Sequence, residues 1–421
     1  MKKSRIVYPL ALLLASVLSC NKTPVEQPPA EGGISGETAA GDSIVIARNR
    51  ESAFTLVRSG MPGNASGLAS FLKDRTGIRF SLSDPYSEPV DYEILVGATS
   101  RPESAAALQE LGGVPGYIVR VSGKKLVVNG SDETWIALGL HAFASRLLST
   151  KDCLRGENLS LPKDFVLKET DSDPQMIARL LLKNYKFSLY IKPVLNCSPI
   201  DDMYVAQGAA GDGKYFYLVM RDSKDTKAVV CKYDIATGLK VAQSEQFNGG
   251  HCNDMTFDTA GGRVIVAHGM SEGKILTPLD GESLKVLPNI NIPVGSGAIT
   301  YSPKRNGYAI SQGGSTFYVT DSSFKVLLDK DRTDNFGYTS QGMGSDESFV
   351  YFPQSPVSGK TDNILVVYDW DGKFITTLSV PSTVESESMF YTAGKYYINF
   401  YAGSKVGAQL YELQPVHYYT Y

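Results

Sequence analysis

Residues 207–219 read Gln-Gly-Ala-Ala-Gly-Asp-Gly-Lys-Tyr-Phe-Tyr-Leu-Val, which predicts a short strand, a tight turn at Asp212 and Gly213, and a second strand. Degraded copies of this phrase recur towards the C-terminus at intervals of about 45 residues. These copies begin near Asn253, Ser296, Gln341 and Glu387. A unit this short cannot bury its own apolar surface, so the copies are expected to pack against one another as equivalent sheets.

A repeat of short strands with this period resembles the blades of a β-propeller, in which four-stranded antiparallel sheets surround one axis. Residues 184–421 therefore predict an all-β propeller, and five copies predict five blades. The predicted strands, blade by blade, are 204–208, 215–220, 228–235 and 240–246; 255–257, 264–268, 274–279 and 284–288; 298–302, 307–311, 315–321 and 325–329; 338–342, 349–353, 363–369 and 374–380; and 388–391, 396–401 and 407–413.

The fifth repeat supplies only three strands. Residues 185–195 alternate between apolar and polar side chains and belong to no repeat. Pairing this segment with residues 409–413 would complete the last blade and remove an exposed strand edge. We therefore expect the propeller to be closed by its own N-terminal strand.

Residues 43–170 mix helical and strand patterns and predict an α+β domain. The predicted elements are a strand at 43–47, a helix at 66–73, a strand at 91–97, a helix at 101–111, a hairpin of 117–121 with 126–129, and a helix at 134–148. Ser131 or Asp132 is the expected N-cap of the last helix. His141 lies within that helix between Leu140 and Ala142, so a structural role is expected for it.

Three segments of this domain follow one another in the order strand, hairpin, helix. They are Tyr92-Glu-Ile-Leu-Val-Gly97, then Gly116-Tyr-Ile-Val-Arg-Val-Ser-Gly-Lys-Lys-Leu-Val-Val-Asn-Gly-Ser131, then the predicted helix from Trp135 to Leu148. This order resembles the accessory domain that precedes the catalytic barrel of alpha-glucuronidases and beta-hexosaminidases. In those enzymes the module lies outside the chemistry, so the resemblance implies an association with carbohydrates and no catalytic residue. The eightfold βα barrel is not predicted here, because helical periodicity ends at about residue 184.

The N-terminus predicts export. Residues 1–20 combine a basic start with an apolar run too short to span a bilayer, and they end in Val17-Leu18-Ser19-Cys20. This ending resembles the lipobox of Bacteroidota-type envelope lipoproteins and implies lipidation at Cys20; an ordinary secretory signal with a chance cysteine is the alternative. Residues 21–42 are rich in Pro, Gly and Glu and predict a disordered tether. The expected location is the outer membrane, reached through the lipid anchor alone, with the periplasmic and surface faces both left open.

Composition excludes several function classes. The net charge of −3 and the lack of a basic patch argue against nucleic-acid binding. The other cysteines are isolated from one another, so neither zinc nor another metal is expected; they are Cys153, Cys197, Cys231 and Cys252. No phosphate loop, dinucleotide fingerprint or nucleophile elbow occurs, and no cofactor is predicted.

Polar residues occur at or just before the inner strand of each repeat, and a propeller would bring them together around its axis. They are Gln207, His251, Asn253, Asp254, Ser296, Gln341, Glu385 and Glu387. We predict a ligand site there, while turn capping and hydrogen bonds between blades are the structural alternative. Five-bladed propeller glycosidases are similar in outline and use carboxylates from different blades. If the protein is an enzyme, Asp254, Glu385 and Glu387 are the acid and base candidates, because glycoside hydrolysis needs two carboxylates about 5–10 Å apart.

Together these features predict a lipid-anchored envelope protein that binds carbohydrate or a glycoconjugate through the central face of the propeller. Tyr204, Tyr338 and Phe390 are expected either to stack on sugar rings or to form core between blades. A glycoside hydrolase or lyase is one alternative. A scaffold that binds another envelope protein is a second. Architecture alone does not choose among these functions.

Overall fold

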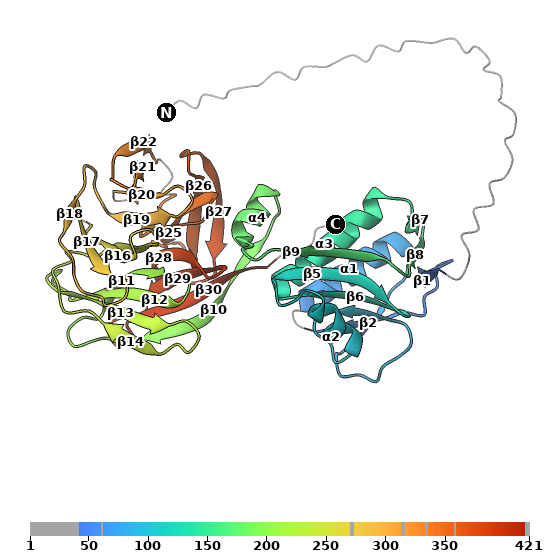
Figure 1. The fold of residues 1–421 in the computed structure, drawn as a ribbon. Helices are drawn as coiled ribbons and strands as arrows, with labels where there is room; N and C mark the ends of the chain where they lie inside the picture. The colour runs from blue at the N-terminus through green and yellow to red at the C-terminus, as the bar shows by residue number, and fades with distance from the viewer. Residues whose placement is uncertain are drawn as a thin grey trace, which may run out of the picture. The chain divides into compact units, whose positions relative to one another are not determined.

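The computed structural model describes residues 42–59, 62–269, 273–312, 316–332, 336–357 and 359–416 (Figure 1). The predicted signal peptide, the lipidation site Cys20 and almost the whole predicted tether lie outside these residues. Residues from Ser43 onward form one compact unit. None of the helices in the described segments has the length and apolar content that crossing a bilayer requires.

The N-terminal part of this unit is built around a six-stranded sheet with the order β3-β2-β4-β6-β5-β9. Its strands are β2 (Thr55–Arg58), β3 (Ser81–Ser83), β4 (Glu93–Val96), β5 (Gly116–Ser122), β6 (Lys125–Gly130) and β9 (Val166–Thr170). Strands β3, β2, β4 and β6 pair in parallel, whereas β5 pairs antiparallel with both β6 and β9. A smaller sheet joins β1 (Ser43–Ala47), β8 (Asn158–Pro162) and β7 (Leu154–Arg155).

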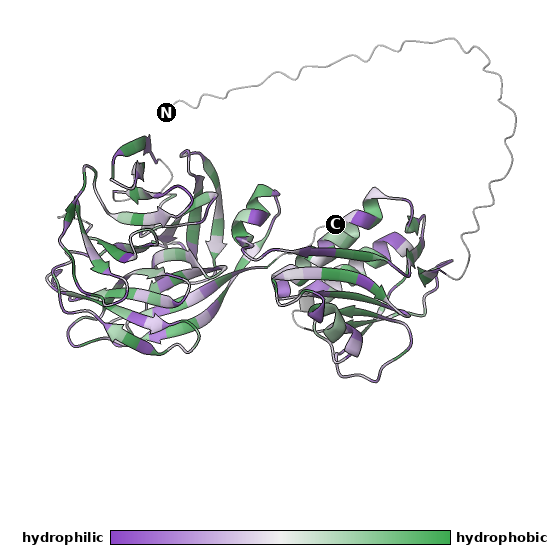
Figure 2. Ribbon diagram, in the orientation of Figure 1, coloured by the Kyte–Doolittle hydropathy of each residue, from purple (hydrophilic) through white to green (hydrophobic). Residues whose placement is uncertain are grey.

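Helices cover both faces of the six-stranded sheet. Helices α1 (Pro62–Thr76) and α3 (Glu133–Ser149) contact each other, while α2 (Pro102–Gln109) packs on β5 and β6. Alternate residues of one strand serve the two faces: Val96 belongs to the core under α1 and α3, and Leu95 to the core under α2. Strands buried on both faces are continuously apolar, and Figure 2 shows the hydrophobic colour following these central strands.

Helix α3 begins as the sequence predicts. The Asp132 carboxylate accepts the Trp135 backbone N–H at 3.0 Å, which makes Asp132 the N-cap. Trp135, Leu140 and Phe143 are buried against the sheet. His141 packs edge-on against the ring of Tyr185, at 4.4 Å between centroids, so it has a structural contact as expected.

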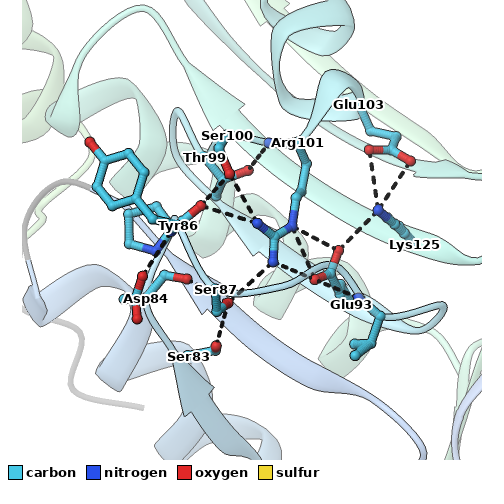
Figure 3. A network of polar contacts seen from close by, with 12 residues as sticks. Ser83, Asp84, Tyr86, Ser87, Glu93, Thr99, Ser100, Arg101, Glu103 and Lys125 are labelled. Carbon is cyan, nitrogen blue, oxygen red and sulfur yellow. Dashed lines mark hydrogen bonds and ion pairs between the residues drawn. The ribbon is translucent and has the colours of Figure 1, made fainter.

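A buried ion pair ties the segment between β4 and α2 to the start of β4 (Figure 3). Arg101 Nη2 lies 2.8 Å from Glu93 Oε1, and the two side chains are 2% and 1% exposed. Lys125 Nζ adds a second cation 2.9 Å from Glu93 Oε2. The Arg101 guanidinium also donates to the Pro85 carbonyl and to Ser87 and Ser100 hydroxyls. Because its donors are used in this way, we interpret the network as structural.

After helix α4 (Met176–Leu182), residues 188–416 form five consecutive antiparallel sheets, which we call the five-sheet region. The first four sheets in chain order are β11 (Val205–Gly211), β12 (Tyr215–Arg221), β13 (Ala228–Asp234) and β14 (Lys240–Gln243); β15 (Asp254–Asp258), β16 (Arg263–Ala267), β17 (Ile275–Asp280) and β18 (Ile290–Asn291); β19 (Ala298–Ser302), β20 (Gly307–Ser311), β21 (Thr316–Asp321) and β22 (Val326–Asp331); and β23 (Thr339–Ser340), β24 (Gly344–Ser345), β25 (Phe349–Ser355), β26 (Asn363–Asp369) and β27 (Phe374–Val380).

The fifth sheet joins distant parts of the chain. Its strands are β28 (Glu385–Thr392), β29 (Lys395–Tyr401), β30 (Ala408–Val416) and β10 (Ser188–Cys197). Strand β10 pairs antiparallel with β30, for example Ile191 with Leu413, so the predicted pairing of 185–195 with 409–413 is present. The pairing brings the start of the five-sheet region against its end.

One strand of each sheet contacts one strand of the next sheet. Strand β11 contacts β15, β15 contacts β19, β19 contacts β24, β24 contacts β28, and β28 contacts β11. We call these five the inner strands. Hydrogen bonds between them recur at one sequence spacing: Ile299 N–H donates to Asp254, and Tyr301 N–H donates to Thr256, in both cases across 45 residues. The repeat in the sequence is thus a repeat of contacts between neighbouring sheets.

The Asp of the repeated turn has a structural role. Asp212 Oδ1 accepts the Tyr215 N–H at 2.6 Å and Oδ2 accepts the Tyr217 hydroxyl at 2.8 Å. Asp346 does the same with the Phe349 N–H and the hydroxyl of Tyr351. The carboxylate therefore closes the turn and holds a tyrosine of the next strand, which explains why Asp and Tyr recur together.

Two predicted strands are wrong. Residues 284–288 make only a single bridge, Leu279 with Val286, and the outer strand of the second sheet is β18 instead. Residues 338–342 do not form the inner strand: they contain only β23, and the inner strand β24 follows them, with both paired to β25. The break falls where Gly342 N–H donates to the Glu387 carbonyl at 2.7 Å, so pairing between sheets replaces pairing within the sheet.

Candidate functional site

Irregular backbone brings three predicted site residues together. Gln207 lies in a bulge of β11, between Ala206 and Ala209, and Glu387 lies in a bulge of β28, between Ser386 and Ser388. Asp254 is the first residue of β15. Bulges redirect side chains that regular pleating would send elsewhere. We call Gln207, Asp254 and Glu387 the axial cluster, because they come from three of the five inner strands.

Asp254 is completely buried. Its Oδ2 accepts the Ile299 N–H at 3.0 Å and the Met343 N–H at 2.8 Å, from two different sheets. Its Oδ1 has no hydrogen-bond partner among the described residues. Burial raises the pKa of this carboxyl well above its ordinary value, although the backbone N–H donors act in the opposite direction. The residue therefore joins the sheets, as the structural alternative predicted, yet keeps one unused oxygen.

Glu387 and Gln207 are 3% and 4% exposed. Gln207 Nε2 donates to the Ala206 carbonyl at 2.8 Å and lies 3.5 Å from Glu387 Oε2, while its Oε1 has no partner among the described residues. Burial raises the pKa of Glu387 well above its usual range, and the charges of Glu385 and Asp254 add to this, whereas Arg221 opposes it. Glu387 thus interacts with both other members of the axial cluster.

Arg221 is the neighbour that the sequence did not identify. It closes β12 and is buried, with Nη1 at 2.6 Å from Asp225 Oδ1 and Nη2 at 3.4 Å from His251 Nε2. His251 Nδ1 in turn lies 3.1 Å from Asp225 Oδ2. Predicted residue His251 therefore belongs to an ion-paired group beside the axial cluster. An isolated arginine at a strand end carries no local signal for such a role.

The remaining predicted residues either join neighbouring segments or lie at the accessible edge beside the axial cluster, which we call the rim. Asn253 Nδ2 donates to the Gly297 carbonyl at 2.5 Å, and buried Ser296 Oγ donates to the Ile275 carbonyl at 3.3 Å, so both join neighbouring segments. Gln341 Nε2 donates to Glu385 Oε1 at 2.9 Å, linking the fourth and fifth sheets. Glu385 is exposed and Gln341 half-buried, so these two can meet a ligand without any rearrangement.

The three predicted aromatic residues also divide. Phe390 is core, packed against Phe216 and stacked on Tyr397 at 5.4 Å between centroids. Tyr204 is half-buried, and its charge contributes to the raised pKa of Tyr401, whose largest cause is burial. Tyr338 lies under the Lys360 ammonium, 5.1 Å from the ring centroid.

A pocket of about 330 Å³ lies at the other end of the inner strands. It is lined by the C-terminal ends of all five inner strands and by the segment before α4. None of the polar residues predicted as a site lines it, whereas Phe390, one of the predicted aromatic residues, does. Its polar and aromatic lining includes Thr256, Thr300, Ser345, Tyr301, Tyr391 and Asp173. Thr300 and Ser345 share a hydrogen bond of 2.8 Å, and the Tyr391 hydroxyl donates to Asp173.

A larger pocket, of about 520 Å³, follows the ends of β2, β4 and β6. Three of its charged groups are already engaged: Asp132 caps α3, and Lys395 Nζ lies 3.2 Å from Glu412 Oε2. The pocket of about 330 Å³, which we call the strand-end pocket, draws on all five inner strands and is the more informative of the two.

No cluster of three His, Cys, Asp or Glu side chains suited to a metal occurs in the described segments. The four cysteines that the structure describes are buried. Burial raises the pKa of Cys197 to about 12 and that of Cys231 to about 11, so neither is a ready nucleophile.

No protein-family model matches the sequence, and no curated protein matches it. Among solved structures, the chain is similar to a hydrazine synthase chain of Kuenenia stuttgartiensis, with TM-score 0.31 and 12% identity over 47% of this chain and 56% of that one. It is also similar to a tail fibre of Staphylococcus aureus phage P68, with TM-score 0.38 and 14% identity over 53% and 52% of the two chains. The chain spans about half the length of each of these two.

A third similar structure is a member of the DUF4221 family from Bacteroides vulgatus, with TM-score 0.34 and 8% identity over 55% of this chain and 99% of that one. At these TM-scores the likeness assigns neither a fold family nor a function.

Proposed function

We propose that this chain is a lipid-anchored envelope protein that binds carbohydrate or a glycoconjugate at the axis of a five-bladed β-propeller. The observation that carries the proposal is the pocket of about 330 Å³, to which all five inner strands contribute. Its volume falls within the range typical of small-molecule sites. Its lining pairs aromatic faces with hydroxyl and carboxylate groups, the combination that sugar rings need.

The propeller assignment rests on the sheet topology. Five antiparallel sheets follow one another along the chain, their inner strands contact one another in a ring, and β10 pairs with β30. A blade ring has each of these properties. The first region, residues 43–170, is proposed to be the accessory domain of carbohydrate-active enzymes, in keeping with the order of its hairpin and of helix α3.

The strand-end pocket is our first choice for the ligand, because the axial cluster is too buried to meet a ligand larger than an ion. The rim above that cluster, with Glu385, Gln341 and Tyr204, is the alternative place for the same ligand. Two double variants distinguish binding in the strand-end pocket from binding at the rim. Tyr391→Ala with Asp173→Asn alters the pocket, whereas Glu385→Gln with Gln341→Ala alters the rim.

The test is affinity electrophoresis of residues 21–421 through gels that contain single polysaccharides, with Tyr190→Ala as control because Tyr190 is exposed and lines neither end. Retardation that is lost in the pocket variant and kept in the rim variant and the control supports the proposal. If retardation is lost in the rim variant alone, the ligand binds at Glu385 and Gln341, the residues predicted from the sequence. If no polysaccharide retards the protein, carbohydrate binding is wrong and the scaffold alternative is favoured.

A glycoside hydrolase or lyase is the second candidate. The observation in its favour is that Glu385 and Glu387 lie on one strand, with the first exposed and the second beneath it. Asp254 is a poor acid or base, because both backbone donors hold its Oδ2 in a closed interior. Release of reducing ends from the retained polysaccharide, abolished by Glu387→Gln while retardation persists, would establish the enzyme.

A further inference from the structure

Carboxylates dominate the charged lining of the strand-end pocket. Asp173, Asp212, Asp346 and Glu347 line it, and Lys304 is the one basic side chain among the described residues that do so. Lys304 Nζ lies 2.8 Å from Glu347 Oε2, so these two charges balance each other. Burial raises the pKa of Asp346 and so reduces its share of the charge. Asp173 and Asp212 therefore supply most of the negative charge of the pocket.

Neutral donors hold these two carboxylates in place. The Tyr391 hydroxyl donates to Asp173 Oδ1, and Gln175 Nε2 donates to Asp173 Oδ2 at 3.2 Å. Asp212 accepts two backbone N–H groups and the Tyr217 hydroxyl. Among the described residues, neither carboxylate has an ion-pair partner within 4 Å. A neutral donor orients a carboxylate without cancelling its charge, so the pocket keeps a net negative charge.

The cations of the neighbouring segments are used elsewhere. Arg179 forms an ion pair with Glu169, and its Nη1 lies 3.4 Å from Asp171 Oδ2. Lys214 Nζ lies over the ring of Tyr215, 4.8 Å from the centroid. Recognition of an acidic group on a ligand generally relies on arginine or lysine donors. An acidic sugar in this pocket would therefore meet carboxylates without a compensating cation.

A positively charged sugar fits the same lining. A concave site whose walls carry one sign of charge focuses the potential inside it, which attracts the opposite charge. Aromatic rings such as Tyr391 attract cations as well. The hydroxyl groups of Thr256, Thr300 and Ser345 are available at the same pocket for the hydroxyl groups of a sugar.

We propose that the strand-end pocket selects amino sugars whose nitrogen is protonated, with the Asp173 carboxylate accepting the ammonium group, and that it rejects acidic sugars. Asp173 is exposed, whereas Asp212 is half-buried. Each Asp173 oxygen accepts one donor from the protein, and an ionised carboxylate has room for about four. The inference rests on the proposed carbohydrate binding and specifies the ligand of that site.

The test is isothermal titration calorimetry of residues 21–421 at pH 6 with tetramers of glucosamine, N-acetylglucosamine and galacturonic acid, and with spermidine. We expect the glucosamine tetramer to bind about three- to fivefold more tightly than its N-acetylated form, as for an exposed ion pair. The galacturonic acid tetramer should not bind, because the pocket repels it. Spermidine should not bind either, because it has the charge but no sugar ring.

Three variants locate the effect. Asp173→Asn keeps an acceptor for the Tyr391 hydroxyl and removes the charge, so it should abolish the preference for glucosamine while the N-acetylated tetramer still binds. Lys304→Gln leaves Glu347 without its counter-ion and should increase the preference. Asp74→Asn is the matched control, since it removes an exposed carboxylate of α1 that does not line the pocket, and it should change neither affinity.

The outcomes separate this inference from carbohydrate binding itself. Equal affinity for the glucosamine and N-acetylglucosamine tetramers, binding of the galacturonic acid tetramer, binding of spermidine, or a preference that persists in Asp173→Asn overturns the proposal. If neither tetramer binds although another polysaccharide retards the protein in gels, the amino-sugar inference is wrong and carbohydrate binding stands. If nothing binds in either assay, both are wrong.

Discussion

The buried ion pair of the N-terminal region allows a quantitative prediction. In Arg101→Met, Glu93 loses the guanidinium that lies 2.8 Å away, although both side chains are almost fully buried. Removing one partner of a buried pair costs about 3–5 kcal/mol, because it leaves an uncompensated charge in the interior. Lys125 Nζ remains 2.9 Å from Glu93 and keeps part of the compensation. We therefore expect the lower end, about 3 kcal/mol.

The double variant tests the cause. In Glu93→Gln with Arg101→Met the buried charge disappears from both partners, so the loss should fall to about 1–2 kcal/mol, less than that of Arg101→Met alone. The assay is equilibrium unfolding in urea, followed by tryptophan fluorescence. The chain has two tryptophans, so a Trp370→Phe background leaves Trp135 of α3 as the reporter of this region.

Two results would contradict an important role for the buried charge. One is a loss below about 1 kcal/mol in Arg101→Met, which would mean that water reaches the pair. The other is a double variant that is less stable than the single one, which would mean that packing and not charge is responsible.

Three further predictions concern the five-sheet region. Burial raises the pKa of Asp346 above its unfolded value. The protonated carboxyl therefore stabilises the fold at low pH, and this contribution is lost as pH rises through the folded pKa. Asp346→Asn should flatten the decline of the unfolding free energy between pH 4 and pH 8, and an unchanged profile would contradict this. Leu189→Ala, which empties a core position on β10, should cost about 2–4 kcal/mol in urea unfolding, whereas a cost near zero would mean that β10 is not needed for closure. The buried thiols of residues 21–421 should react with a thiol reagent at pH 7.5 only after addition of urea, because burial keeps Cys197 and Cys231 protonated, and rapid labelling of the native protein would show that these interiors open.

The sequence predicts regular elements of this protein well. The period of the repeat locates most strands of the five-sheet region within two or three residues, and strands β19, β20, β26 and β27 have the predicted bounds. Helix α3 and its N-cap follow from an amphipathic pattern and one capping side chain. Both patterns are local in the sequence, so the elements can be predicted from them without knowledge of tertiary contacts.

Irregular elements were not predictable in the same way. The bulges at Gln207 and Glu387 arise from contacts between sheets, and nothing in the neighbouring sequence marks them. The split between β23 and β24 has the same origin, because Gly342 pairs with Glu387 on another sheet. The edge strand β3 carries three residues with weak β preference and is held by pairing alone.

The candidate site was likewise predictable only in part. Position in the repeat identified the axial residues, since equivalent positions meet near one axis. It did not distinguish Asp254, which is closed in the interior, from Glu385, which is exposed. Nor did it identify the strand-end pocket, because its hydroxyl and aromatic residues occur equally often in ordinary strands.

The most direct test of our account is a crystal structure of residues 21–421 with the oligosaccharide whose parent polysaccharide gives the strongest retardation. We predict sugar density in the strand-end pocket, in contact with Tyr391 and with the hydroxyl groups of Thr256 and Thr300. Density at Glu385 and Gln341 instead, with the pocket filled only by solvent, would contradict it.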